Sequence, residues 1–273
     1  MHSEIIKYPV RHPLLRNYIK FFWEIRMGQA QLDHLLIPQR NINLRFNLSE
    51  TPQYVSVNNQ EYLLEEVYFS GLQDHFTNAR LKLNGSVHML GVCFLPEGFY
   101  PFLQIPVSEC KNQLLGAEET GLKHIHTIND QLKEAQDTET RLAILENKLA
   151  SLLNADMQTP ETFRKLFNAL EQNAETVSLA DFCALHHIGI RQLERMYNKY
   201  VGMSAKTYFA LNRFHHSLNE LLRNNYSKLS DIAYGNGYFD QMHFIRDFKR
   251  FAGETPKTFA AQNNSILQIG KMK

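Results

Sequence analysis

The sequence predicts an α+β protein in which a β-rich N-terminal domain, residues 1–155, precedes an all-α domain, residues 160–265. Apolar and polar residues alternate in the first half, which is the period of a strand with one buried face. From about residue 129 the apolar spacing changes to three and four, the period of a helix. Residues 154–159 (NADMQT) interrupt the pattern before Pro160, which predicts a linker followed by a helix with Pro160 at its first position.

The composition is that of an ordinary globular protein. Apolar residues make up 44% of the 273 residues and charged residues 21%, which argues against a disordered or fibrous chain. The most apolar stretch, residues 92–107, contains three prolines and cannot cross a membrane. The N-terminus lacks the apolar core of a secretion signal, and the three cysteines have no C-x-x-C spacing. We therefore expect a cytoplasmic protein with reduced thiols and no membrane contact.

The strands of the first half are predicted from alternation. Residues 41–48 alternate strictly, with Ile42, Leu44, Phe46 and Leu48 on one face and polar residues on the other, so we expect burial of one face only. Further strands are expected, with turn residues between many of them, at 32–37, 53–57, 66–69, 79–83 and 87–95. Short helices are expected at 14–22 and 98–103.

An internal repeat organises the second half. Residues 191–208, moved forward by 51 positions, lie over residues 242–259. Four aligned pairs are identical: Arg195/Arg246, Gly202/Gly253, Lys206/Lys257 and Thr207/Thr258. Two copies are too few to stack as a solenoid, so the repeat indicates two small helical units.

Each copy has the pattern of two helices joined by a tight turn. In the first copy, Ser178 is expected to cap a helix over 179–187, Gly189 to turn the chain, and a second helix to cover 191–200. The second copy is expected to comprise a helix from 229 or 230 to 234, a G-N-G turn at 235–237 and a helix over 240–251. Two further helices are expected: 138–153, rich in leucine, and 204–224, which joins the units and offers Tyr208, Leu211, Leu218, Leu221 and Leu222 for burial.

The two second helices carry polar faces suited to DNA. Each has a buried stripe: Leu193, Tyr197 and Tyr200 in one, and Phe244, Phe248 and Phe251 in the other. The opposite faces carry Arg191, Gln192, Arg195, Asn198 and Lys199, and Met242, His243, Arg246, Lys249 and Arg250. Such donors and acceptors suit base edges and phosphates in the major groove. The charge distribution is consistent with DNA binding by the second half. Residues 160–273 contain 15 basic and 10 acidic residues, whereas residues 1–159 contain 14 basic and 18 acidic residues.

Residues 176–259 resemble the C-terminal DNA-binding domain of the AraC/XylS family of bacterial transcription regulators. The resemblance is strongest over residues 232–259 (IAYGNGYFDQMHFIRDFKRFAGETPKTF), which include the G-Y pair, R-x-F-K-R and G-x-T-P of that family. Ala205 stands where the family commonly has proline. The N-terminal half is similar, more weakly, to an uncharacterised domain that precedes this module in many members, which implies a sensor or dimerisation role.

The resemblance implies that both recognition helices read bases in double-stranded DNA. The positions it selects are Arg191, Gln192, Glu194 and Arg195, and Gln241, Met242, His243 and Arg246. Glu194 lies beside the core stripe, so it either accepts from a cytosine amino group or pairs with Arg191 or Asn198. Lys199, Lys249 and Arg250 are better placed for phosphates. RNA polymerase, a second copy of the chain and an unidentified small-molecule effector are further candidate partners.

The main alternative is a metal-dependent, cupin-like enzyme fused to a DNA-binding module. The β-rich half contains candidate ligands in His34, His75, His88, Cys93 and Glu97. They show no H-x-H or H-E-x-x-H spacing, and the H-I-H run at 124–126 is expected in a loop. A DNA-repair methyl transfer would need a reactive cysteine, but Cys93 lies in a predicted strand. Architectural DNA binding would require more lysines. We expect no catalytic residue, metal or cofactor.

Overall fold

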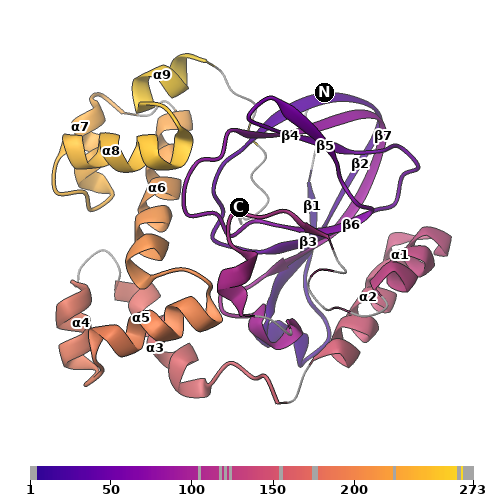
Figure 1. Ribbon diagram of the computed structural model, residues 1–273, viewed down its shortest axis with the longest axis horizontal. Coiled ribbons are helices and arrows are strands. Elements are labelled where there is room, and N and C mark those ends of the chain that lie inside the picture. The colour runs from indigo at the N-terminus through magenta and orange to yellow at the C-terminus, as the bar shows by residue number, and fades with distance from the viewer. Residues whose placement is uncertain are drawn as a thin grey trace.

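The computed structural model has the predicted α+β architecture, with strands first and helices after them (Figure 1). It describes residues 5–103, 106–116, 119, 122, 125–153, 156–173, 178–223, 226–262 and 266. Residues 154 and 155 of the expected linker lie outside this part of the chain, as do His124 and Asn224.

An eight-stranded antiparallel sheet forms the N-terminal part, in the order β1-β2-β7-β3-β6-β8 with β4 paired to β5 and β7. Its strands are β1 (Ile6–Tyr8), β2 (Ile19–Leu36), β3 (Asn43–Asn47), β4 (Tyr54–Val57), β5 (Gln60–Leu63), β6 (Val67–Ser70), β7 (Ala79–Phe94) and β8 (Leu115–Gly116). The long strand β7 pairs with β2 along one edge, and with β3 and then β4 along the other. A register shift between Met27 and Ala30 bends the β2–β7 pair.

The α-helices follow the sheet in the chain. The α-helices are α1 (Ile125–Glu134), α2 (Thr138–Leu152), α3 (Glu161–Asn173), α4 (Leu179–Leu185), α5 (Ile190–Tyr200), α6 (Ala205–Arg223), α7 (Leu229–Gly235), α8 (Gln241–Ala252) and α9 (Pro256–Ala261). Three 3-10 helices connect strands: η1 (Leu15–Asn17), η2 (Tyr100–Phe102) and η3 (Val107–Cys110). Helices α1 and α2 pack beside the sheet, and the later helices lie on its other side (Figure 1). No helix in the described ranges is long and apolar enough to cross a membrane.

Several boundaries differ from the prediction. The helix expected over 14–22 is wrong, because only η1 is helical there and β2 begins at Ile19. Phe22 faces the larger core while Phe21 and Trp23 face a second, smaller one, so this strand is buried on both faces and shows no alternation. The strands expected at 79–83 and 87–95 are one strand, β7.

Other differences concern helices. His126 lies in α1 rather than in a loop. The helix expected over 98–103 is reduced to the 3-10 helix η2. Pro160 precedes α3 instead of opening it, and its carbonyl accepts the amide of Arg164. Leu222, offered for burial, is exposed, because the buried face of α6 passes through Leu218 and Leu221.

The strand β3 is buried on both faces, which corrects the expectation of one buried face. Leu44 and Phe46 enter the larger core as predicted. Asn43, Arg45 and Asn47, on the opposite face, are also buried instead of facing water. Asn43 and Arg45 of this polar face line a partly open cavity of the β part.

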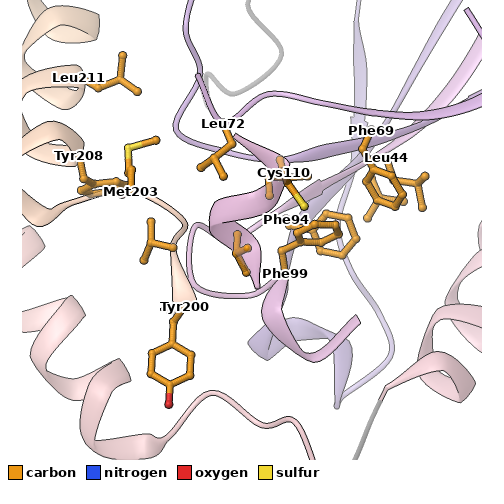
Figure 2. Packing of buried hydrophobic residues seen from close by; sticks show 14 of the residues in the cluster. Leu44, Phe69, Leu72, Phe94, Phe99, Cys110, Tyr200, Met203, Tyr208 and Leu211 are labelled. Atoms are coloured by element: carbon orange, nitrogen blue, oxygen red, sulfur yellow. The ribbon is translucent and has the colours of Figure 1, made fainter. Parts of the chain in front are cut away.

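One hydrophobic cluster joins the β part to the helices. It runs from Phe69, Phe94 and Phe99 to residues of α5 and α6. Figure 2 shows Leu72 between these phenylalanines and Met203, which begins the approach to α6. Contact is close at Gly202, where an added Cβ would lie 2.5 Å from Leu72 and 2.8 Å from the carbonyl of Val107. The positive φ of 83° at this residue also favours glycine. The two parts are therefore packed directly against each other.

Candidate nucleic-acid interface

The predicted pair of helix-turn-helix units is present. Helices α4 and α5 form the first unit, α7 and α8 form the second, and α6 joins them (Figure 1). The hydroxyl of Ser178 accepts from the amide of Asp181 and caps α4, as predicted. Asp240 caps α8 in the same way, by accepting from the amide of His243 at 2.6 Å. Gly253 ends α8 with a positive φ of 79°.

The buried stripes of the two second helices also agree with the prediction. Leu193 and Tyr197 of α5 are fully buried, as are Phe244 and Phe248 of α8. Tyr197 packs against Phe163 and Phe167 of α3, and Phe248 packs against Phe214 of α6. Aromatic burial of this kind holds each recognition helix at a set rotation, so its opposite face is presented outward.

Eight of the twelve predicted contact residues are exposed on these outward faces. They are Arg191, Gln192, Arg195 and Asn198 of α5, and Gln241, Met242, Arg246 and Lys249 of α8. Met242 is 62% exposed although it is apolar. These side chains are free to meet a partner without unfolding either unit.

Glu194 has an intramolecular role that the sequence reading did not include. Its Oε2 accepts from the amide of Ala205 at 2.9 Å, at the first residue of α6. A carboxylate at a helix N-terminus satisfies an otherwise unpaired N–H and interacts favourably with the helix dipole. Neither pairing expected for its side chain, with Arg191 or with Asn198, is formed; the Asn198 side chain donates instead to the backbone carbonyl of Glu194.

His243 is turned toward its own unit. Its Nε2 lies 3.5 Å from the Asp247 carboxylate, and its ring packs edge-on against Tyr238. The side chain is half-buried, unlike Met242 beside it. These contacts make His243 a weaker candidate for base contact than Arg246.

Lys199 and Arg250 lie where the helical part meets the β part. The ammonium group of Lys199 is 5.5 Å from the ring centre of Tyr100 in η2 and 5.2 Å from that of Tyr200. The carbonyl of Arg250 accepts from the amide of Phe76 at 3.0 Å. Both side chains are exposed, but their surroundings differ from the open face predicted for phosphate contacts.

Exposed apolar side chains beside the recognition helices were missed. Phe239, which precedes α8, is 86% exposed, and Tyr234 is 65% exposed. Leu185 and Ile190 occupy a similar place before and at the start of α5. Apolar groups in this position can contact thymine methyl groups. The available signal was that Phe239 falls outside the spacing of the buried stripe.

The candidate metal ligands of the β part are not gathered together. His88 Nε2 lies 2.8 Å from Glu24, and His75 pairs with the adjacent Asp74. Burial raises the pKa of the Cys93 thiol to about 12, which keeps it protonated and unreactive. Within the described ranges, no group of three or more His, Cys, Asp and Glu side chains could hold a metal ion.

Comparison with known proteins agrees with this geometry. Residues 182–262 match a domain family described as a helix-turn-helix domain, and residues 11–116 match a domain of unknown function, DUF6597. The transcriptional activator RhaR of Yersinia pseudotuberculosis is 33% identical over 95 residues, which is 34% of this chain and 32% of that protein. RhaR of Mannheimia succiniciproducens is 29% identical over 98 residues, which is 36% of this chain and 35% of that protein. The chain therefore matches only about a third of the length of these relatives.

Among solved structures, ToxT from Vibrio cholerae O395 is similar with a TM-score of 0.43 and 12% identity, covering 90% of this chain and 98% of ToxT. The relatives compared by sequence are described as transcriptional activators and not as enzymes. The repeat, the exposed polar faces of α5 and α8 and the family match lead to one assignment. The C-terminal part of this chain is a helix-turn-helix DNA-binding domain of the AraC/XylS type.

Proposed function

We propose that the protein is a sequence-specific transcription regulator whose helices α5 and α8 read adjacent segments of the major groove. The observation that carries the proposal is the pair of equivalent helices, each with a buried aromatic stripe and an exposed face of Arg, Gln and Asn. The 19 residues of α6 between them span about 28 Å at helical rise. That length is close to one turn of DNA, ~34 Å, which suits two units bound on one side of the duplex.

Base reading is proposed for the exposed residues that extend from the N-terminal and middle turns of each helix. Arg191, Gln192 and Arg195 serve this role in α5, and Gln241, Met242 and Arg246 in α8. Lys249 and Asn198 are proposed to contact the sugar-phosphate backbone of the DNA. Lys199 and Arg250 are proposed to contact it at the edge of the interface. Glu194 supports the start of α6, and His243 supports α8 through Asp247.

We further propose that the β part, as residues 1–155, controls the DNA-binding domain, as residues 160–265. Support comes from the loop between β6 and β7, because Leu72 packs at Gly202 after α5 and Phe76 contacts the end of α8. An added Cβ at Gly253 would lie 2.4 Å from the Phe76 ring. One loop of the β part therefore touches the ends of both recognition helices.

The β part has a second attachment, to α6. Arg40 donates to the side chain of Asn212 at 2.6 Å, and the Pro38 carbonyl lies 2.8 Å from Nε2 of His215. A small molecule or a second copy of the chain acting on the β part would reach the recognition helices through these contacts. RNA polymerase is the proposed further partner, at a promoter in the cytoplasm.

Selection from a random double-stranded DNA library, at ~150 mM salt, tests the proposal. We compare the wild type with Arg195→Ala, Arg246→Ala and a control, Lys165→Ala, whose side chain is 76% exposed on α3. The wild type and the control should enrich one bipartite motif. Each arginine variant should relax a different half of it, at a cost of ~1–3 kcal/mol per bidentate contact. Weak, equal binding by all four proteins without a motif would contradict sequence-specific reading.

A further inference from the structure

The β part contains a cavity of about 360 Å³ beside Asn43 and Arg45 of β3, which is partly open to solvent. Its walls are largely apolar and include Leu36, Ile37, Val55, Val57 and Leu81. The size is in the range of small-molecule sites, ~300–1,000 Å³, which are mostly apolar with a few placed polar groups. The polar groups of this cavity therefore indicate what it binds.

Arg45 is held in the wall of the cavity by a row of residues across four strands. It lies opposite Tyr68 of β6 and Gly91 of β7, and Gly91 lies opposite Trp23 of β2. A Cβ at Gly91 would be 2.1 Å from the indole ring, so glycine leaves the space that this ring fills. The guanidinium of Arg45 consequently lies 5.6 Å from the ring centre of Trp23 and 5.7 Å from that of Tyr68.

Three polar groups in this wall are buried without a partner. Arg45 is 6% exposed, and its Nε has no hydrogen-bond partner among the described residues. The same holds for the hydroxyl groups of Tyr68 and Ser70, which are 2% and 8% exposed and line the same cavity. Water could satisfy the two hydroxyls, but it provides no counter-charge for a guanidinium, which does not deprotonate in proteins. The ring faces compensate the charge in part. A bound anion would supply the rest.

The acidic residues of the cavity do not take that place. Glu65 and Glu119 line it, but both are exposed, and Glu119 accepts from the amide of Gly116 at 2.9 Å. Exposed charges are screened by salt, so these carboxylates add little to the partial compensation of the Arg45 charge by the two rings. They do disfavour a ligand that carries several negative charges.

We propose that this cavity binds a small molecule with a single carboxylate group and a mainly apolar body. The carboxylate accepts from the guanidinium of Arg45, whose fork of N–H groups suits a carboxylate, and from the hydroxyls of Tyr68 and Ser70. The apolar body lies against the aliphatic walls. Gly71, Gln73 and Thr77 also line the cavity, so the ligand touches the loop that carries Leu72 and Phe76. Any effect of this ligand on DNA binding rests on the regulation by the β part proposed above. The binding of the ligand itself does not.

Trp23 is the single tryptophan of the chain, and its ring lies beside the guanidinium, so its fluorescence reports on the site. We would titrate the full chain, without DNA, with 4-phenylbutanoate, 4-phenylbutanamide and 4-phenylbutylamine, and with octanoate and octanamide. The carboxylates should change the Trp23 emission and bind at least about tenfold more tightly than the matched amides and the amine.

Variants then identify the anchor. Arg45→Met keeps an unbranched apolar side chain without the charge, and should weaken carboxylate binding about tenfold or more. Ser70→Ala should weaken it a few-fold, and Arg11→Met, at a side chain 60% exposed elsewhere on the β part, should leave it unchanged. Thermal denaturation without ligand shows whether each variant folds. If Arg45→Met does not fold, the proposal is tested by the carboxylate affinity of Ser70→Ala and by the ratio of the affinities of the wild type for the acids and their amides.

Three results would overturn the proposal. They are equal binding of the acids and their amides, undiminished acid binding by a folded Arg45→Met, and no response to either carboxylate up to about 5 mM. Because no DNA is present, each of these failures leaves the base-reading proposal standing. Failure of the library selection would likewise leave the result of the titration unaffected.

Discussion

Acid should weaken the fold through one buried carboxylate, that of Glu24 in β2. Its side chain is 2% exposed and lies 2.8 Å from Nε2 of His88. Arg26 donates to it at 2.8 Å, and the hydroxyls of Tyr8 and Thr138 do so at 3.0 Å. Because Thr138 is the first residue of α2, this carboxylate ties α2 to the sheet. Replacement by Glu24→Gln removes the charge while nearly preserving the shape.

The expected magnitude follows from the pKa of Glu24. Burial by itself would raise this pKa, but hydrogen bonds from His88, Arg26 and Tyr8 outweigh it and lower the pKa to about 2. An unfolded chain would have a value near 4.3, so the shift corresponds to roughly 3 kcal/mol of stability at pH 7. Since the folded pKa is the lower one, this stabilisation is complete above about pH 5 and is lost as the pH falls toward 2. About half of it should remain at pH 3.

Urea denaturation at pH 7 and pH 3 measures the effect. Glu24→Gln should lower the free energy of unfolding by about 3 kcal/mol at pH 7, and by about half as much at pH 3. The control is Glu139→Gln, which removes an exposed ion pair with Arg11 and should cost at most ~1 kcal/mol at either pH. A difference between wild type and Glu24→Gln that is the same at both pH values would refute the reasoning.

Three further substitutions test the site and the core. Glu194→Ala should lower the free energy of unfolding by ~1 kcal/mol, because the amide of Ala205 loses its partner, and should leave the selected DNA motif unchanged. A relaxed motif at unchanged stability would instead assign base reading to Glu194. Phe239→Ala should change the free energy of unfolding by no more than ~0.5 kcal/mol, because this side chain is exposed. It should nevertheless weaken binding to the selected DNA, measured by fluorescence anisotropy. Unchanged affinity would place Phe239 outside the interface. Gly91→Ala should cost ~2 kcal/mol or more and alter the near-ultraviolet circular dichroism of Trp23, since the new methyl group would overlap the indole; wild-type stability would contradict the packing described.

The helical half could be predicted well because its signals are local. Ser178 and Asp240 cap helices through bonds to residues three positions away, and Gly253 stops a helix by its own backbone conformation. Because the repeat contains the same pattern twice, both helix-turn-helix units could be predicted without knowledge of any long-range contact. The buried stripes followed from the helical period, since one face of each helix must be covered.

The β half was predicted less accurately because burial on both faces removes alternation. The start of β2 lies between two cores, so its aromatic run was mistaken for a helix face. Two strands were predicted at 79–83 and 87–95, but Gly85 lies with a positive φ of 81° within the continuous strand β7, opposite the register shift of β2. The segments that cover each face of a strand are set by the arrangement of the whole sheet, so they cannot be predicted from the sequence of that strand alone.

The polar residues of the site depended on tertiary contacts in the same way. Spacing alone placed Arg195, Arg246 and Lys199 on outward faces and Glu194 beside the buried stripe. Packing then separated them, because Glu194 is bonded to the start of α6 and Lys199 lies beside Tyr100, while the two arginines remain exposed. These partners lie on other elements, so helical periodicity could not reveal them.

Local chemistry in the chain was therefore sufficient to predict the two helix-turn-helix units, the cap at Ser178 and the buried stripes of α5 and α8. The environment of Arg45 was decided by the tertiary structure. Alternation in β3 put Arg45 on a polar face and predicted contact with water, but β6 and β7 bring Tyr68 and the Trp23–Gly91 pair around it. Hydrogen bonds within a turn or helix need only neighbours in sequence, whereas the solvation of a charge depends on every chain segment that folds over it.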